Sequence, residues 1–225
     1  MNYRQVLKAI KDRDTKDARL EKINRAKLLA LGLKLYRPRR VLAIDTGKVE
    51  GVDRAVGQIK SKLKKSDCVI TLEGISGSGK SATAERLAER IKAVRFSFGE
   101  LFRYLTYLKL ADPKAAWPVV FKKLRYRFSG GQLNLWDGRI NVSRTLVSEL
   151  RQPEIETSVP RIAEDTQKPA LELFAREIFK LGQSGRKIVI EGRAFTLDFL
   201  PADVRIKLRC DARIRASRRL KQASI

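Results

Sequence analysis

The first part of the chain alternates charged and apolar positions at a spacing that suits one face of a helix. Within residues 3–35, the apolar positions of this face are Val6, Ile10, Leu20, Ile23, Leu28, Leu31 and Leu35. This period predicts one or two helices. The sequence Tyr-Arg-Pro-Arg-Arg at 36–40 ends the pattern, because proline cannot donate a hydrogen bond in a helix interior and restricts the residue before it. A further helix is expected over about 51–65, so residues 1–67 are predicted to be helical.

From residue 67 onward the pattern changes to that of an α/β domain. Residues 68–72 form a β-branched run, and after a glycine-rich loop come apolar residues at helical spacing, namely Ala82, Ala84, Leu87, Ala88 and Ile91. The later runs 187–190 and 204–208 predict buried strands, and 169–181 predicts an amphipathic helix. Strands that alternate with helices form a parallel sheet with helices on both faces. We expect 68–72 to be the central strand, flanked by the two later strands.

The glycine-rich loop matches a phosphate-binding motif in full. Residues 74–81 read Gly-Ile-Ser-Gly-Ser-Gly-Lys-Ser, which is the P-loop pattern G-x-x-x-x-G-K-[ST] set between a strand and a helix. Its glycines allow backbone N–H groups to surround phosphate oxygens, and the helix that follows adds its positive end. The candidate ATP-binding residues are Gly74, Ser76, Gly77, Ser78, Gly79, Lys80 and Ser81. Lys80 would contact the β- and γ-phosphates, and the Ser81 hydroxyl would ligate Mg²⁺.

Composition excludes several kinds of chemistry. The 225 residues include no histidine, so a His-based catalytic triad is excluded and general-base chemistry is left to carboxylates. No apolar run approaches the roughly 20 residues of a membrane span, and the start of the chain lacks the apolar stretch of a secretory signal. We therefore expect a cytoplasmic protein without a membrane partner.

The chain is strongly basic, with 49 Lys and Arg against 25 Asp and Glu and a formal net charge of +24. Residues 1–67 hold 19 of the basic and 8 of the acidic side chains. Such charge favours RNA or another polyanion as a partner, although it can also serve solubility alone. One interpretation of 1–67 is a basic helical extension with affinity for RNA. The other is a helical collar packed on the rest of the chain through Leu28, Leu31 and Leu35.

Several stretches beyond the P-loop resemble the cytidylate kinases, a branch of the nucleoside monophosphate kinases. In order along residues 68–222 they are Gly-Glu-Leu-Phe-Arg-Tyr-Leu-Thr at 99–106, Gly138 followed by Leu-Arg-Gln-Pro-Glu-Ile at 150–155, Val-Ile-Glu-Gly-Arg at 189–193, Pro-Ala-Asp-Val-Arg-Ile-Lys-Leu at 201–208, and the helical stretch 213–222. One such string would be a weak signal. Several in the same order are fairly specific.

The resemblance implies a three-layer P-loop NTPase fold with a parallel central sheet, in a domain over 68–225. A small inserted lobe at about 111–160 would bind the monophosphate. The implied reaction is the ATP- and Mg²⁺-dependent phosphorylation of CMP or dCMP, in which positioning and charge stabilisation supply most of the catalysis. By resemblance, Lys80, Arg103 and Arg193 would be catalytic, Arg103, Arg151, Arg193 and Ser97 would bind the monophosphate, and Ser81 and Glu191 would hold Mg²⁺.

Three departures from the family leave a second function open. Ala194 stands where most bacterial members have an aspartate, with Thr-Leu-Asp at 196–198 in place of Gly-Thr-Val, and Phe98 stands where Ser or Thr is common. Family members also continue with an arginine-rich lid, then a further strand and helix, and we expect this C-terminal lid to be missing after Ile225. The alternative function is a degenerate kinase fold that binds RNA or the ribosome.

Overall fold

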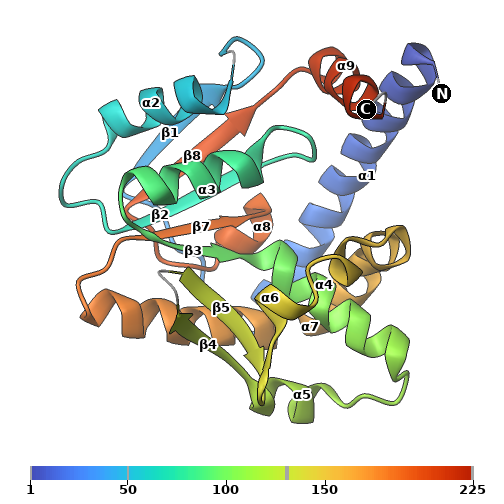
Figure 1. Ribbon diagram of the computed structural model, residues 1–225, viewed down its shortest axis with the longest axis vertical. Helices are drawn as coiled ribbons and strands as arrows, with labels where there is room; N and C mark the ends of the chain where they lie inside the picture. The colour runs from blue at the N-terminus through green and yellow to red at the C-terminus, as the bar shows by residue number, and fades with distance from the viewer. Residues whose placement is uncertain (1, 50, 130–131, 224–225) are drawn as a thin grey trace.

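The computed structural model describes residues 2–49, 51–129 and 132–223, and a five-stranded parallel sheet lies at its centre (Figure 1). The strand order is β1 (Arg40–Asp45), β8 (Val204–Arg209), β2 (Val69–Gly74), β7 (Ile188–Gly192) and β3 (Val94–Ser97). β2 is the central strand and is flanked by β8 and β7, so the predicted strand order is confirmed. Parallel neighbours need crossover connections, which place helices on the faces of the sheet.

Helices cover both faces of this sheet. α2 (Val52–Lys62) and α3 (Lys80–Arg90) pack on one face, and α4 (Phe98–Ala111) and α7 (Pro153–Gln183) pack on the other. Successive side chains of a strand point to opposite faces, so one strand can contribute to both hydrophobic cores. On β7, for example, Ile190 belongs to the core with α4 and α7, whereas its neighbour Val189 belongs to the other core. The three-layer α/β fold is therefore confirmed.

The description of residues 1–67 as a helical extension is wrong at β1. This strand pairs in parallel with β8 over its whole length. Ile44 of β1 and Val56 and Ile59 of α2 are buried in the core against the central sheet. The run Val-Leu-Ala-Ile at 41–44 is too short for its period to separate strand from helix. The region before residue 68 thus contributes an edge strand and a core helix to the same sheet as the P-loop.

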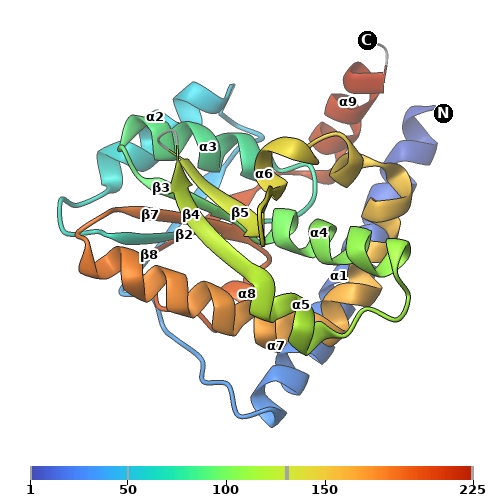
Figure 2. The same ribbon diagram turned by 60° about the horizontal axis from the view of Figure 1, so that its bottom comes forward.

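α1 (Tyr3–Ala30) packs along the outside of the domain, beside α9 (Ala212–Ala223) (Figures 1 and 2). Leu28 of α1 is 2% exposed and lies in the core with α4 and α7. Leu31 and Leu35 follow the end of the helix and are 54% and 48% exposed. The collar interpretation is therefore right for Leu28 and wrong for the other two leucines.

A small antiparallel sheet covers the same side of the central sheet as α4 and α7 (Figure 2). Its strands and the short elements around it are α5 (Trp117–Lys123), β4 (Leu124–Ser129), β5 (Gln132–Asp137), β6 (Ile140–Asn141), α6 (Val142–Thr145) and the 3₁₀ turn η1 (Glu149–Arg151). Tyr126 of β4 meets Phe96 of β3 edge-on, with 5.2 Å between ring centroids, and Phe174 of α7 at 5.5 Å. Such pairs add about 0.5–1.5 kcal/mol beyond area burial. The small lobe is therefore anchored to the central sheet.

α7 is longer than the sequence predicted. It spans 31 residues and begins at Pro153 rather than near residue 169, so the end of the expected insert lies on the helix that supports the sheet. Pro160 and Pro169 lie inside it, and these prolines concealed the continuity of the helical pattern. In the described part of the chain, none of the helices has both the length and the apolar character of a membrane span.

Replacing Ile59 of α2 by alanine should destabilise the whole domain, because this side chain is fully buried against the central sheet. We expect a loss of about 2–4 kcal/mol in the free energy of unfolding, measured by urea denaturation. Gln58→Ala, on the exposed face of the same helix, is the control and should change the value by less than about 0.5 kcal/mol. Equal stability of the two variants would show that α2 is an appendage.

Candidate active site

The P-loop joins the end of β2 to the start of α3, and its backbone conformation depends on glycine. Gly77 and Gly79 adopt left-handed φ angles of 78° and 81°, a region that disfavours other residues. A Cβ at Gly74 would lie 2.5 Å from Oγ of Ser78. Gly79 immediately precedes Lys80, the first residue of α3, so the positive end of the helix adjoins the loop. This combination favours the binding of an anion.

Lys80 and Glu191 form the charged centre beside the loop. Burial lowers the pKa of Lys80, the negative charge of Glu191 opposes this shift, and Arg193, Arg103 and Arg95 add to the lowering. Burial alone would raise the pKa of Glu191, but the positive charges of Arg95 and Lys80 outweigh it, and the net shift is downward. Arg95 donates to Oε1 of Glu191 at 2.6 Å. Glu191 therefore supplies negative charge in a strongly cationic site.

Ser81 and Glu191 fit the expected site of a Mg²⁺ ion that accompanies a nucleotide. The Ser81 hydroxyl contributes to the lowered pKa of Glu191, so the two side chains lie together. Oε2 of Glu191 is buried without a hydrogen-bond partner among the described residues. Among those residues, no group of three or more His, Cys, Asp or Glu side chains could hold a metal. A bound ion would therefore need oxygens from phosphate as well as from the protein.

A cavity of about 1010 Å³ lies between α3, the end of β7 and the small lobe. It gathers five of the predicted site residues, Ser81, Ser97, Arg103, Arg151 and Glu191. Arg103 forms an ion pair with Glu156 of α7 at 3.2 Å, and both side chains are exposed to solvent. The carboxylate of Glu156 is therefore positioned where a phosphate could replace it.

Several polar residues of this cavity escaped the sequence analysis. They are Arg95, Glu100, Asn134, Arg144 and Arg186. Arg95 had a usable signal, because it alternates with the buried Val94 and Phe96 on β3 and must point to the opposite face of the sheet. Asn134 and Arg144 had none, because the small lobe brings them to the cavity from distant parts of the chain.

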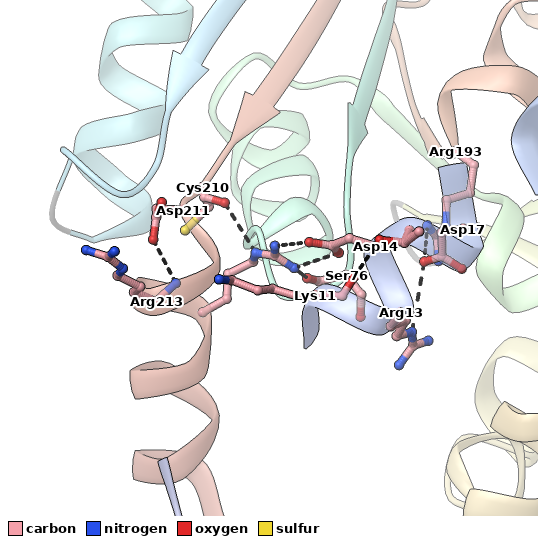
Figure 3. A network of polar contacts seen from close by, with 11 residues as sticks. Lys11, Arg13, Asp14, Asp17, Ser76, Arg193, Cys210, Asp211 and Arg213 are labelled. Atoms are coloured by element: carbon pink, nitrogen blue, oxygen red, sulfur yellow. Dashed lines mark hydrogen bonds and ion pairs between the residues drawn. The ribbon is translucent and has the colours of Figure 1, made fainter. Parts of the chain in front are cut away.

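Arg193 lies outside the lining of this cavity. It follows β7 and precedes the short α8 (Ala194–Leu197), and its Nη1 donates to Oδ2 of Asp17 on α1 at 2.8 Å (Figure 3). It is still close enough to Lys80 to lower its pKa. Arg193 therefore stands between the P-loop lysine and the N-terminal helix, a neighbour that the sequence did not predict.

A second cavity, of about 500 Å³, lies against the P-loop on a different face of α3. The loop lines it with Ser76, Gly77, Ser78 and Gly79. The remaining lining residues include Thr46, Val49, Val52, Ala55, Arg215, Arg218 and Arg219. Its walls come from opposite ends of the sequence, so no single motif could reveal it.

The positions that depart from the family pattern serve packing. Phe98 is buried and stacks on Phe174 with 3.8 Å between ring centroids. Thr196 and Leu197 are buried in α8, and the carboxylate of Asp198 is engaged by arginine side chains. Ser97, which the sequence offered as a substitute at position 98, caps α4, and its Oγ accepts from the Glu100 N–H at 3.4 Å.

A parallel sheet whose central strand ends in a glycine loop with a partly buried lysine is the architecture of a P-loop phosphotransferase. The family model for cytidylate kinase matches residues 70–225. The chain is 30% identical to a cytidylate kinase of Chlamydia pneumoniae over 160 residues, which cover 68% of this chain and 70% of that protein. It is 32% identical to that of Chlamydia caviae over 162 residues (68% and 70%), and 31% identical to that of Enterococcus faecalis over 162 residues (68% of each). The chain therefore belongs to the cytidylate kinase family and is a nucleoside monophosphate kinase, as the sequence motifs predicted.

Glu191→Gln should destabilise the protein in a pH-dependent way. The folded-state pKa of Glu191 is lowered, so its ionised form stabilises the protein above the ordinary pKa near 4.5, and this contribution disappears as the pH falls through the folded-state value. We expect the variant to lose about 1–3 kcal/mol at neutral pH, measured by urea denaturation, and the loss to shrink when the measurement is repeated at acidic pH, below 4.5.

Glu85→Gln is the matched control for this variant. Glu85 also pairs with Arg95, at 3.6 Å, but its side chain is exposed. Its replacement should cost less than about 0.5 kcal/mol at either pH. A Glu191→Gln effect that is the same at both pH values would contradict the assignment of a buried, ionised carboxylate.

Proposed function

We propose that the protein transfers the γ-phosphoryl group of ATP to CMP or dCMP. The relatives reported above are named cytidylate kinases, which supports a cytidine nucleotide as the acceptor. The observation that carries the proposal is the position of the P-loop at the start of α3. A separate cavity lies on either side of this helix. A kinase of this class must hold two nucleotides with their phosphates facing each other, and two cavities in this arrangement would allow it.

The donor nucleotide would occupy the P-loop and the second cavity. Backbone N–H groups of the loop bind the phosphates, and the ammonium of Lys80 contacts the β- and γ-phosphates. The apolar side chains of Val49 and Val52 provide a surface for the base. Ser81 and Glu191 would hold Mg²⁺, which neutralises charge on the phosphates when it is bound.

The acceptor would lie in the larger cavity, with its phosphate near Arg103 and Arg151. The planar guanidinium fork binds phosphate in a bidentate way that lysine cannot reproduce. A phosphate monoester has a second pKa near 6, so the acceptor is already ionised at neutral pH. Its attack on the γ-phosphoryl therefore requires no general base, which agrees with a chain that has no histidine.

Catalysis in this site would come from positioning and charge. Transfer spreads negative charge over the oxygens of the moving phosphoryl group, and cations placed beforehand stabilise that charge without reorganising. Lys80 and Arg193 lie close to each other beside the P-loop and would supply this stabilisation. The comparisons favour the kinase and do not favour RNA binding as the main function.

Lys80→Ala should abolish binding of Mg-ATP, because the neutral side chain no longer contacts the β- and γ-phosphates. Isothermal titration calorimetry measures the binding, and an assay of ATP-dependent CDP formation from CMP measures the activity. Lys60→Ala, an exposed position on α2, is the control and should bind as the unaltered protein does. Undiminished Mg-ATP binding by Lys80→Ala would show that the loop does not serve ATP.

Arg151→Ala should raise the KM for CMP by about tenfold or more, since a charged hydrogen bond of about 1.5–3 kcal/mol is lost. The KM for ATP should stay within about twofold, because the guanidinium lines only the acceptor cavity. Arg151→Lys should recover part of the loss. Steady-state kinetics with CMP, dCMP and UMP measure these values, and an unchanged KM for all three acceptors would remove Arg151 from the site.

A further inference from the structure

The N-terminal segment, by which we mean α1, β1, α2 and the residues that join them, touches the P-loop at two points. Oγ1 of Thr46, just after β1, donates to the carbonyl oxygen of Ser78 at 2.9 Å. Asp14 of α1 accepts from Nη1 of Arg215 at 3.1 Å and also pairs with its Nη2. The same Nη1 donates to the carbonyl oxygen of Ser76 at 3.1 Å. The segment thus reaches the loop once directly and once through a buried arginine.

A further contact of the segment lies beside the P-loop lysine. Asp17, one turn after Asp14 on α1, accepts from Arg193 at 2.8 Å. Glu21 lies one turn further along α1. Burial raises the pKa of its carboxyl group, and the positive charge of Arg193 opposes this upward shift. Three acidic side chains in successive turns of α1 therefore face the cationic end of the sheet, because residues three or four apart share one face of a helix.

The segment also forms part of the wall of the second cavity. Thr46, Val49, Val52 and Ala55 lie opposite the backbone of the P-loop there. These residues belong to the connection from β1 to α2 and to α2 itself. A donor nucleotide in this cavity would therefore contact the segment as well as the loop.

In the fold, the N-terminal segment occupies the edge of the central sheet next to β8. β1 extends the sheet next to β8, and α1 lies beside α9, which follows β8 in the chain (Figures 1 and 2). The family match begins at residue 70, on β2, so the segment precedes it. The alignments with the two Chlamydia proteins cover 68% of this chain and 70% of each relative. About a third of this chain and of each relative therefore lies outside the alignment. The segment supplies a helix, a strand and a helix at the edge that follows β8.

We infer that the N-terminal segment is the closing part of the kinase fold, carried ahead of β2 in a circularly permuted order. In this arrangement α1 borders the P-loop end of the site, and Asp14 and Asp17 are positioning residues. Asp14 holds Arg215 against the P-loop, and Asp17 holds Arg193 beside Lys80. The inference rests on the proposed function, because it names the residues that complete the same site.

Holding rather than blocking is the role that the contacts favour. Arg215 is 4% exposed, and among the described residues Asp14 is its one charged partner, since its other hydrogen bonds go to the carbonyl oxygens of Ser76 and Cys210. Separating a buried guanidinium from its carboxylate strongly destabilises the folded protein. Asp14 therefore stays in place when a nucleotide binds. Asp17 engages Nη1 of Arg193, and the guanidinium fork has further N–H groups for a phosphate.

Three single substitutions in the full chain, Asp14→Asn, Asp17→Asn and Asp12→Asn, test the positioning roles. Asp12 is exposed on the same helix and serves as the control. We expect Asp14→Asn to weaken Mg-ATP binding about tenfold, measured by calorimetry, because Arg215 no longer steadies the loop. We expect Asp17→Asn to lower kcat about tenfold while Mg-ATP affinity stays within about twofold. Asp12→Asn should match the unaltered protein in both.

The outcomes of this series separate the alternatives. If Asp14→Asn and Asp17→Asn bind Mg-ATP as tightly as the control Asp12→Asn and have the same kcat, the positioning roles are overturned. A higher kcat or tighter nucleotide binding in Asp17→Asn would show that α1 blocks the site, and would overturn the inference as well. If no monophosphate is phosphorylated by the unaltered protein, the proposed function fails, and the Mg-ATP affinities of Asp14→Asn and Asp12→Asn still decide the role of Asp14.

A rejoined chain tests the permutation itself. It would begin at residue 66, run to 225, and continue through a flexible Gly/Ser linker into residues 2–65, so that the segment follows α9. We expect one cooperative thermal transition within about 5 °C of the original, with Mg-ATP affinity within about twofold. A rejoined chain that fails to fold, or that folds without binding Mg-ATP, would overturn the permuted order. Testing linkers of several lengths distinguishes a failure caused by a linker that is too short from a failure caused by the permuted order itself.

Discussion

The concentration of positive charge at the carboxyl end of β2 is the constraint on which the rest of the structure depends. Lys80 is partly buried there, and three arginines lie close enough to lower its pKa. Burying cations together is costly unless each has a partner of opposite charge. The structure pairs four arginines around the site with carboxylates: Arg95 with Glu191, Arg103 with Glu156, Arg193 with Asp17 and Arg215 with Asp14. These carboxylates come from β7, α7 and α1, so three distant parts of the chain must meet at the site.

These ion pairs differ in how readily a phosphate could replace the carboxylate. The Arg103–Glu156 pair is exposed, and exposed pairs contribute about 0–1 kcal/mol, so an incoming phosphate displaces Glu156 at little cost. Arg215 is buried with Asp14, and breaking such a pair leaves an uncompensated charge. Burial thus divides the arginines into those that exchange partners with substrate and those that support the loop. Arg193, with its side chain partly exposed, stands between these two groups.

The sequence predicted the parts of this structure that depend on local order. The run at 68–72, the glycine loop and the helix after it are neighbours in the chain, so period and motif identified the central strand and the phosphate site together. β1 was missed because four apolar residues carry too little periodicity to identify a strand. Asp17 and Arg193 are 176 residues apart, and nothing in either local sequence marks the other as its partner. Contacts of this kind follow from topology, and the helical prediction for 1–67 concealed the strand that determines the topology.

The charge of the N-terminal segment shows why a net count of charges is a poor guide to a partner. Residues 1–67 carry 19 basic and 8 acidic side chains, which favours a polyanion when only the sum is considered. On α1, however, Asp14, Asp17 and Glu21 are half-buried toward the cationic loop, whereas Lys8, Lys11, Lys16, Arg19 and Lys22 are exposed. The acidic minority is therefore the part of the segment that contacts the site. The basic majority keeps this helix hydrated on its outer face, and its charge requires no nucleic acid to explain it.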